Sequence, residues 1–404
     1  MRVLILGAAG RSGRAVRASL FPLRGIDGVI LADGEAEALN KLAAVSAPFA
    51  VSARFLDAGD ARSLRERVSE ADLVIGCLGP AYRYEEGVVD AVLEVGRDYI
   101  SLGDDTRAYL AALSREEEAR RKGVRIFLGC GMAPGLSGLL ARRAAAGVQG
   151  ARKVEFFWSL RELFSLGDAA VAQMAHSFAG KASLLRARRA DMVRAGSWGE
   201  AAEFPPPTGR CVLYYIDHPE PLTVSRFLPD VEEAGFKAGL EKRGEELILH
   251  TLAWLGEENF AELWWNAVRL AAGLGKRMED PCPSSLRVTV EGMRREGRYR
   301  VSLGMSGDYY RLTGLVAAEL VYRMMEAGRL HPGVHTLEEC LDDRVFFDRL
   351  HHAGARFFLA EECISREGDA AGRGMGRAEG SGGDDRDSAR ACTGARKQDS
   401  IRLL

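Results

Sequence analysis

Residues 2–13 read Arg-Val-Leu-Ile-Leu-Gly-Ala-Ala-Gly-Arg-Ser-Gly, and residues 28–33 read Gly-Val-Ile-Leu-Ala-Asp. The first apolar run ends in a glycine-rich turn, a segment of helix length follows, and the second apolar run ends in an acid. The run at residues 3–6 is short and wholly apolar, which is typical of a strand buried on both faces of a sheet. This order of elements predicts a βαβ unit with a ligand site at its turn.

The three glycines of the turn predict a dinucleotide site. Gly7 ends the strand, Gly10 lets the backbone approach a pyrophosphate without an intervening Cβ, and Gly13 lets the helix lie close to the sheet. Unpaired amides and the positive end of the helix dipole favour a phosphate there. We therefore expect the pyrophosphate to be bound by Gly7, Gly10, Arg11, Ser12 and Gly13. The alternative is an ordinary strand-to-helix turn that binds nothing.

The acid that ends the second run indicates which dinucleotide is bound. Asp33 lies 20 residues after Gly13, where a carboxylate can accept hydrogen bonds from both ribose hydroxyls of an adenosine. Its charge would repel a 2′-phosphate and so favours NAD over NADP. Arg11 and Arg14 favour the opposite choice, whereas Gly34 stands where an NADP enzyme often has an arginine. We expect NAD or NADP as cofactor, with NAD favoured.

Composition limits the class of protein. The 404 residues carry a formal net charge of −2 and are 47% hydrophobic, enough for two domains with cores and unlike a protein that mainly binds nucleic acid. No apolar run reaches the roughly 18 residues of a membrane span, and the N-terminal run is expected to be a core strand, not a signal peptide. Seven cysteines without a C-x-x-C pair favour a reduced, cytoplasmic protein. His331, His335 and His351-His352 lack a ligand pattern, so no metal is expected.

Apolar runs alternate with amphipathic segments through the first third of the chain. Strands are expected near residues 2–6, 28–32, 51–56, 72–77, 98–102 and 124–128, and helices near 12–20, 35–44, 61–69, 84–95 and 106–122. Six such alternations predict an α/β fold, a Rossmann-type doubly wound parallel sheet.

The middle of the chain predicts an inserted α+β domain with an open sheet. Strands are expected at residues 153–160 and 210–216, and a hairpin at 286–291 and 298–305. A long helix is expected at 168–195, with His176, Lys181 and several arginines along or beyond it. An arginine there could hold a substrate carboxylate, although a solvated basic face is the commoner meaning of such a pattern.

The last part of the chain is expected to return to the first domain. A helix is predicted from residue 308 to about 326, a turn at 329–333, and further helical pieces to about 362. Residues 366–404 are rich in Gly, Asp, Arg, Ser and Ala, which predicts a disordered tail. The expected domains are 1–132 plus 308–365, which bind the dinucleotide, 133–307, which bind substrate and pair subunits, and the tail 366–404.

Small and polar residues follow the strand ends, where ligands bind in a doubly wound sheet. Asp57 and Ala58 after the third strand are expected near the adenine, and a turn after the fourth strand is expected along the nicotinamide ribose. That turn consists of Cys77, Leu78, Gly79 and Pro80. Either segment could instead be a plain strand-ending turn.

Three further groups are candidates for the substrate side. Asp104 could face the cleft and bind an ammonium group while Asp105 caps the next helix, although either acid could be the cap. Tyr82 could offer a phenol, although half-buried packing is the commoner role. The segment that borders the substrate is expected to be Gly131, Met132, Ala133, Pro134 and Gly135.

These motifs resemble the saccharopine dehydrogenase-like family over residues 1 to about 362. The resemblance rests on the glycine turn, the Cys-Leu-Gly-Pro turn at 77–80, the segments 96–105 and 129–135, and the returning segment with Tyr310-x-x-Thr313-Gly314. It implies a Rossmann domain, an inserted substrate and dimer domain, and NAD(P)-linked oxidoreduction at C–N bonds of amino acids or polyamines. Ser101 stands where relatives commonly carry an aspartate, and Asp104 is the candidate to replace it.

The sequence therefore predicts an NAD(P)-dependent oxidoreductase that acts on a small molecule as a homodimer. Asp104 and Tyr82 are the candidates for proton handling. Two alternatives stay open. One is a non-catalytic dinucleotide sensor or interaction protein on the same fold. The other is an imine reductase similar to dihydrodipicolinate reductase, whose glycine turn is similar but whose paired-histidine and lysine motif is missing here.

Overall fold

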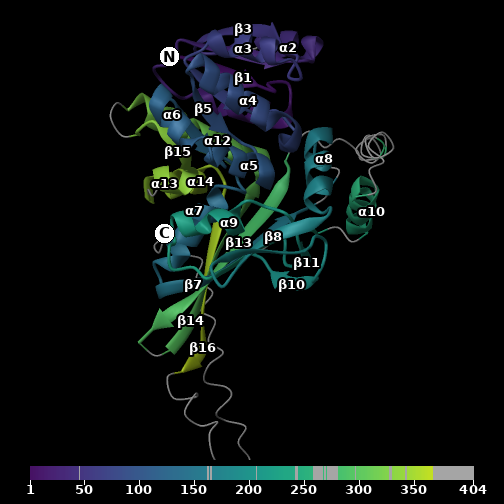
Figure 1. The fold of residues 1–404 in the computed structure, drawn as a ribbon, viewed down its shortest axis with the longest axis vertical. Helices are drawn as coiled ribbons and strands as arrows, with labels where there is room; N and C mark the ends of the chain where they lie inside the picture. Colours follow the sequence, from purple (N-terminus) through teal and green to yellow (C-terminus); the bar gives the residue numbers. More distant parts are fainter. Residues whose placement is uncertain are drawn as a thin grey trace, which may run out of the picture.

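The chain forms two β-sheets with helices packed around them (Figure 1). The computed structural model describes residues 1–44, 46–161, 163, 166–205, 207–241, 244–257, 267, 270, 281–295, 297–326, 330–341 and 344–366. The expected tail lies outside these residues, except for Arg366, and so does part of the turn expected at 329–333.

The first sheet has seven strands in the order β15-β6-β5-β4-β1-β2-β3, and every neighbouring pair is parallel. Its strands are β1 (Arg2–Leu6), β2 (Gly28–Asp33), β3 (Ala50–Phe55), β4 (Leu73–Gly76), β5 (Asp98–Ser101), β6 (Arg125–Leu128) and β15 (Gly333–Thr336). The strand order reverses between β1 and β4, which opens a crevice at their carboxyl ends. The predicted doubly wound parallel sheet is confirmed.

Helices cover both faces of this sheet because alternate residues of its strands are apolar on both sides. Val3 and Ile5 belong to the core on one face, and Leu4 and Leu6 to the core on the other. The flanking helices are α1 (Arg11–Leu20), α2 (Ala36–Ala43), α3 (Ala61–Ser69), α4 (Ala81–Val95), α5 (Thr106–Leu113), α6 (Glu116–Lys122) and α12 (Tyr309–Met325). The helix expected at 106–122 is thus divided into α5 and α6.

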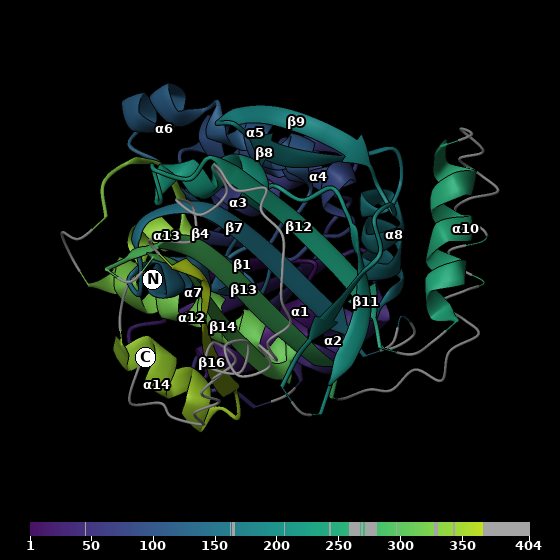
Figure 2. The same cartoon turned by 90° about the horizontal axis from the view of Figure 1, so that it is seen from below.

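The second sheet is mixed and follows the order β10-β11-β12-β7-β13-β14-β16, with β8 paired to β12 and β9 to β8. Its strands are β7 (Gln149–Leu160), β8 (Lys181–Arg186), β9 (Arg189–Arg194), β10 (Glu200–Glu203), β11 (Arg210–Tyr215), β12 (Glu233–Leu240), β13 (Pro283–Arg294), β14 (Gly297–Asp308) and β16 (Arg356–Arg366). Seen from below, β12, β7 and β13 run side by side (Figure 2). The predicted α+β architecture and its hairpin are confirmed.

The remaining helices surround the second sheet or connect it to the first. They are α7 (Leu136–Ala145), α8 (Asp168–Ser177), α9 (Glu220–Thr223), the 3-10 helix η2 (Val224–Arg226), α10 (Glu245–Glu257), α13 (Leu337–Cys340) and α14 (Arg344–His352). Helix α7 packs on β13 and β14. Figure 1 shows α8 next to the first domain and α10 farther out. No helix in the described ranges has the length and apolar character to cross a membrane.

The long helix predicted at 168–195 is wrong beyond its first part. Helix α8 ends at Ser177, and the chain then forms the antiparallel hairpin β8–β9, in which Arg186 pairs with Arg189. Ala187 and Arg188 form the two-residue loop with φ angles of 46° and 64°. A loop with two positive φ angles matches the twist of a hairpin. The basic residues from Lys181 to Arg194 therefore lie on the two strands of a hairpin and, for Arg188, in its loop, and not along a helix.

The end of the described chain also differs from the prediction. Helical pieces were expected to about residue 362, but β16 is a strand that pairs antiparallel with β14, from Gly297↔Arg366 to Ser306↔Arg356. The returning segment thus contributes α12 and β15 to the first domain and β16 to the second sheet. The assignment of residues 356–365 to the first domain is corrected accordingly, and the other domain limits stay a prediction.

The hairpin loop gives a test of this correction. L-residues in the left-handed region cost roughly 1–2 kcal/mol, and Asn-Gly is the preferred pair for such a loop. We expect the double variant A187N/R188G to raise the Tm of the protein by about 2 °C. The control A190G places glycine within β9 and should lower the Tm. A helix at these positions would instead be destabilised by both changes, so a lower Tm for A187N/R188G would contradict the hairpin.

Candidate functional site

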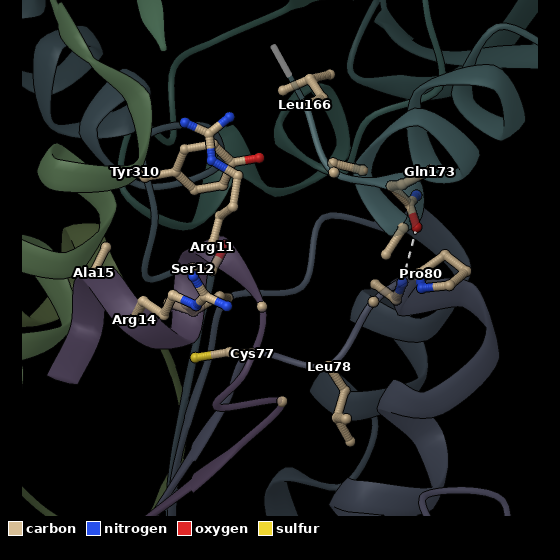
Figure 3. Close-up of a pocket in the computed structure, with 18 of the residues that line it drawn as sticks. Arg11, Ser12, Arg14, Ala15, Cys77, Leu78, Pro80, Leu166, Gln173 and Tyr310 are labelled. Carbon is tan, nitrogen blue, oxygen red and sulfur yellow. Dashed lines mark hydrogen bonds between the residues drawn. The ribbon is translucent and has the colours of Figure 1, made fainter. Parts of the chain in front are cut away.

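A cavity of about 1830 Å³ extends from the carboxyl ends of β1, β2, β3 and β4 to α8 and the second sheet. Its dinucleotide half is lined by the glycine turn and by the ends of the strands. Its other half is lined by Asp104, α8, Trp158, Ile216, His218 and Tyr309. Figure 3 shows part of this lining, with Arg11, Ser12 and Arg14 opposite Leu166 and Gln173.

The glycine turn is held by close backbone contacts. Gly7 has a φ of +76°, and a Cβ there would lie 2.6 Å from the carbonyl oxygen of Cys77. A Cβ on Gly13 would lie 2.4 Å from the oxygen of Gly7. Gly10 is the N-cap of α1, and its Cβ would meet only the oxygen of Gly7, at 3.3 Å. The turn is therefore packed against β4 and α1, while Gly10 lines the open side.

The residues predicted to bind the dinucleotide gather in this cavity with one exception. Those that line it are Gly7, Gly10, Arg11, Ser12, Asp33, Asp57, Ala58, Cys77, Leu78, Gly79 and Pro80. Gly13 lies behind the turn and acts on its shape. Space beside Gly10, amides at the start of α1 and polar side chains around them fit a dinucleotide pyrophosphate.

Asp33 also fixes the turn. Its Oδ2 accepts a hydrogen bond from the amide of Ala9 at 2.8 Å, and its Oδ1 accepts one from the amide of Glu35 at 3.1 Å. Each carboxylate oxygen has a further lone pair, so the same side chain can accept ribose hydroxyls. This carboxylate therefore connects the position of the turn to the recognition of the ribose.

Tyr310 is a cavity residue whose position the sequence did not predict. The guanidinium carbon of Arg11 lies 4.3 Å from the centroid of the Tyr310 ring. Figure 3 shows the two side chains next to each other. Tyr310 stands at the start of α12, 300 residues from the glycine turn in sequence. Its motif in the returning segment was the only available signal. The contact orients Arg11 over the cavity that would hold the cofactor.

Asp104 and Asp105 take the roles of cleft residue and helix cap. The Asp105 side chain accepts a hydrogen bond from the amide of Ala108 at 2.9 Å and caps α5, whereas Asp104 lines the cavity. Burial, together with the charges of Asp105 and Glu85, raises the pKa of Asp104 to about 7. Asp104 can therefore change its protonation state near neutral pH.

Tyr82 does not line the cavity. Its ring packs on His176, with centroids 4.3 Å apart, and Nε2 of His176 lies 3.4 Å from Oδ2 of Asp105. Burial raises the pKa of Tyr82 to about 12, which keeps its phenol protonated. The structure thus gives Tyr82 a packing position beside the Asp105 cap, and the proton-handling role expected for it is not carried further.

Ser101 has a structural explanation in the buried side chain behind it. Glu85 is 6% exposed and accepts a hydrogen bond from the Tyr99 hydroxyl at 3.0 Å. Burial raises the pKa of Glu85 to about 7, while hydrogen bonds from Ser101 and Tyr99 lower it. An aspartate at position 101 would add a second carboxylate beside Glu85, and like charges in a buried site repel. A serine hydroxyl is neutral and donates to the carboxylate instead.

The segment 131–135 is buried and does not line the cavity, contrary to the prediction that it borders the substrate. Met132 is 0% exposed and Ala133 is 4% exposed. A Cβ on Gly135 would lie 2.3 Å from the oxygen of Gly129, so this segment forms a tight turn before α7. Its backbone lies against two side chains of the second domain, His218 and Glu220.

The sequence analysis missed several residues at the substrate end. Gln173 accepts a hydrogen bond from the Ala81 amide at 2.9 Å and so connects α8 to the turn after β4. Trp158 stacks on Tyr309 with centroids 5.8 Å apart. His218 follows β11 within the sequence Ile-Asp-His-Pro-Glu-Pro, whose polar residues after a strand were the available signal. No group of His, Cys, Asp or Glu within the described ranges has the arrangement of a metal site.

The parallel sheet, its glycine turn and the cavity at the strand ends define a dinucleotide-binding domain of the Rossmann type. Residues 3–127 match the family described as saccharopine dehydrogenase NADP-binding domain, so this domain is of the saccharopine dehydrogenase-like, NAD(P)-binding family. The predicted resemblance is confirmed. The match supports a nicotinamide dinucleotide as cofactor and NAD(P)-linked oxidoreduction as the class of activity. Among curated proteins, no sequence matches the chain.

Among solved structures, one with a TM-score above 0.5 shows the same fold at low sequence identity. Apo saccharopine dehydrogenase (L-Glu forming) from Saccharomyces cerevisiae is 14% identical, with 88% of this chain and 99% of that chain covered and a TM-score of 0.61. An engineered D-amino acid dehydrogenase bound to NADP⁺ is 15% identical with the same coverage and a TM-score of 0.43. A DAP dehydrogenase of C. glutamicum in complex with DAP is 14% identical, again with the same coverage, and has a TM-score of 0.42.

Two glycine variants separate the shape of the turn from its contact with ligand. We expect Gly13→Ala to lower the Tm of the ligand-free protein, because its Cβ would overlap the backbone of Gly7. Gly10→Ala should leave that Tm nearly unchanged, yet weaken dinucleotide binding at least about tenfold, or about 1.4 kcal/mol. Thermal shift with NADH and NADPH measures both effects. Unchanged dinucleotide binding by Gly10→Ala would contradict the placement of the pyrophosphate.

Proposed function

We propose that the protein is an NAD(P)-dependent oxidoreductase that acts at the C–N bond of an amine-bearing small molecule. The observation that carries this proposal is Asp104, a carboxyl group with a pKa of about 7 on the cavity wall. It lies at the end of β5, next to the turn 77–80 that ends β4. A carboxylate in this place suits the ammonium or iminium form of a substrate.

Different residues of the cavity would bind the cofactor and the substrate. The turn at residues 7–13 and Asp33 would hold the pyrophosphate and ribose, and residues 77–80 would lie along the nicotinamide ribose. When bound, the nicotinamide supplies or accepts the hydride, so the protein contributes positioning and electrostatics. Trp158 and Tyr309 would cover the substrate, and Asp104 would fix its nitrogen. A homodimer in the cytoplasm stays a prediction.

A dinucleotide sensor without catalysis is the second candidate. It would need the same turn but no titratable group at the substrate end. The position of Asp104 favours the enzyme, because a carboxyl group with a pKa near 7 in a cavity is poised to exchange a proton at neutral pH.

NAD is the proposed physiological cofactor because Asp33 places a carboxylate at the end of β2. We expect Asp33→Asn, which removes the charge and keeps the size, to raise the affinity for NADPH relative to NADH by about tenfold, or about 1.4 kcal/mol. Fluorescence titration with each dinucleotide measures the ratio. Asp57→Asn, at another strand end on the same cavity, is the matched control and should leave the ratio unchanged. Tighter binding of NADPH than NADH by the unmodified protein would contradict the NAD preference.

The role of Asp104 is tested by comparing the variant Asp104→Asn with the control variant Asp105→Asn. A panel of amino acids, polyamines and cyclic imines is assayed at 340 nm with NAD(H) and NADP(H). For a substrate that turns over, kcat/KM should rise with pH through about 7, because the charged carboxylate is the binding form. Asp104→Asn should lower kcat/KM about 100-fold above pH 7 and remove this rise.

Asp105→Asn is the matched control, since asparagine also caps helices. It should keep the pH dependence near that of the unmodified protein. The proposed function is contradicted if no compound with an amine or imine turns over. The assignment of Asp104 is contradicted if Asp104→Asn retains the rise of kcat/KM near pH 7.

A further inference from the structure

We propose that His218, which lines the cavity, and Glu220 behind it form a proton relay, in which Glu220 orients the imidazole of His218 and His218 donates a proton to the substrate. This inference rests on the proposed function and extends it. His218 lines the cavity and is 1% exposed, and Glu220 at the start of α9 is 2% exposed. A buried titratable side chain on a cavity wall with a second one in contact with it is a candidate for a functional pair.

The geometry places one ring nitrogen toward the acid. Nδ1 of His218 lies 3.4 Å from Oε2 of Glu220, the long end of hydrogen-bond distance. The Ser137 hydroxyl donates to the other oxygen, Oε1 of Glu220, at 2.6 Å. The His218 ring stacks on Phe236 with centroids 3.7 Å apart and an interplanar angle of 16°. The ring plane is therefore fixed, and Nε2 lies on the ring edge opposite the contact with Glu220.

The polar atoms of this pair lack full partners. Both ring nitrogens of His218 and Oε2 of Glu220 are buried and make no hydrogen bond of good geometry, although the backbone of Ala133 interacts with the His218 ring and that of Gly135 with the Glu220 carboxyl group. A buried polar group without a partner is costly, so these atoms are poised for a ligand or for each other. Hydrogen bonds of catalytic groups are often long without ligand and shorten when substrate binds.

Burial sets the protonation state of both groups. It lowers the pKa of His218 to about 3, partly opposed by the nearby backbone of Ala133. It raises the pKa of Glu220 well above its usual range, and the charge of Glu338 adds to this effect. Tyr109, which also feels Glu220 and Glu338, stays protonated because burial raises its pKa. Both shifts favour the neutral forms of the two groups, an imidazole beside a carboxylic acid, over an ion pair.

The positions of the hydrogens on Glu220 and His218 define the direction in which a proton would move. Ser137 donates to Oε1, so the acid proton of Glu220 belongs on Oε2 and faces Nδ1. Nδ1 then accepts and Nε2 carries the ring hydrogen. Ile216, Ser177 and Gln173 line the same cavity and are uncharged, whereas Asp104 is a titratable residue at its substrate end. In the proposed relay Nε2–H is the donor to the substrate nitrogen, and because this atom is buried in the ligand-free structure, substrate binding must expose it.

The step balances in the reducing direction. As the substrate carbon is reduced, the π pair of the C=N bond becomes a lone pair on nitrogen. This lone pair takes the proton from Nε2 of His218, while Nδ1 takes the proton from Oε2 of Glu220. His218 ends neutral with its hydrogen on Nδ1, and Glu220 ends as a carboxylate. A proton from water restores the starting state after the product leaves.

The pair is tested first by NMR of the full chain labelled with ¹⁵N-histidine. His218→Asn assigns the signal of His218, and His250→Asn is the matched control. His250 is a half-buried histidine on α10 that packs on Phe178 and Tyr214. We expect the His218 signal to stay neutral from pH 5 to pH 8, with the hydrogen on Nε2. Titration near its ordinary pKa of about 6.5, or a hydrogen on Nδ1, would overturn the relay.

The second test uses two variants of Glu220. Glu220→Gln can still donate to Nδ1 but has no transferable proton, so the Nε2–H form should persist while kcat falls about 100-fold and KM changes less than about threefold. Glu220→Ala should lose the preference for the Nε2–H form as well. Binding of NADH, followed by its fluorescence, should match the unmodified protein in both variants.

The outcomes separate the relay from the proposed function. An unchanged kcat in Glu220→Gln overturns the relay even if amines or imines are substrates. If no such compound turns over in the unmodified protein, the proposed function fails and the donor role fails with it. The NMR result still decides whether the neutral pair exists, because it requires no substrate.

Discussion

The site depends on the close approach of three backbone segments at the end of β1. Gly7 lies against the carbonyl of Cys77, and Gly13 lies against the carbonyl of Gly7, at distances where no side chain fits. These contacts lock the turn between β4 and α1 and leave Gly10 beside open space. Asp33 adds a hydrogen bond to Ala9 and ties the turn to β2. The cradle for a pyrophosphate is therefore a product of backbone packing as much as of side chains.

The substrate end follows a different principle, since it combines several buried carboxyl groups whose pKa values burial raises. Burial raises the pKa of Glu85 and Asp104 to about 7, and raises that of Glu220 above its usual range. A serine at position 101, instead of an aspartate, avoids a second negative charge beside Glu85, which is buried behind Ser101. Asp104 is the one of these three acids that lines the cavity, and a cationic substrate group would favour its ionised form.

The sequence predicts the first domain well because its signals are local. Buried parallel strands read as apolar runs, and the glycine turn and the Asp105 cap depend on neighbours within a few residues. Sequence patterns fail to predict the secondary structure where contacts between distant segments determine it. β16 is a strand because β14 offers it a partner, and the hairpin after α8 depends on two residues with positive φ that are neither Gly nor Asn. His218 and Tyr310 reach the cavity only through the placement of the second sheet and α12.

The central claim is that one cavity holds a dinucleotide along the strand ends and presents its nicotinamide to Asp104 and His218. A crystal structure of the complex with NADH tests this most directly. The account predicts the pyrophosphate at Gly10, the adenosine ribose at Asp33, and the nicotinamide ring past Pro80 on the side of Asp104. A dinucleotide bound in the reverse direction, or with its nicotinamide outside the space between Asp104 and His218, would contradict it.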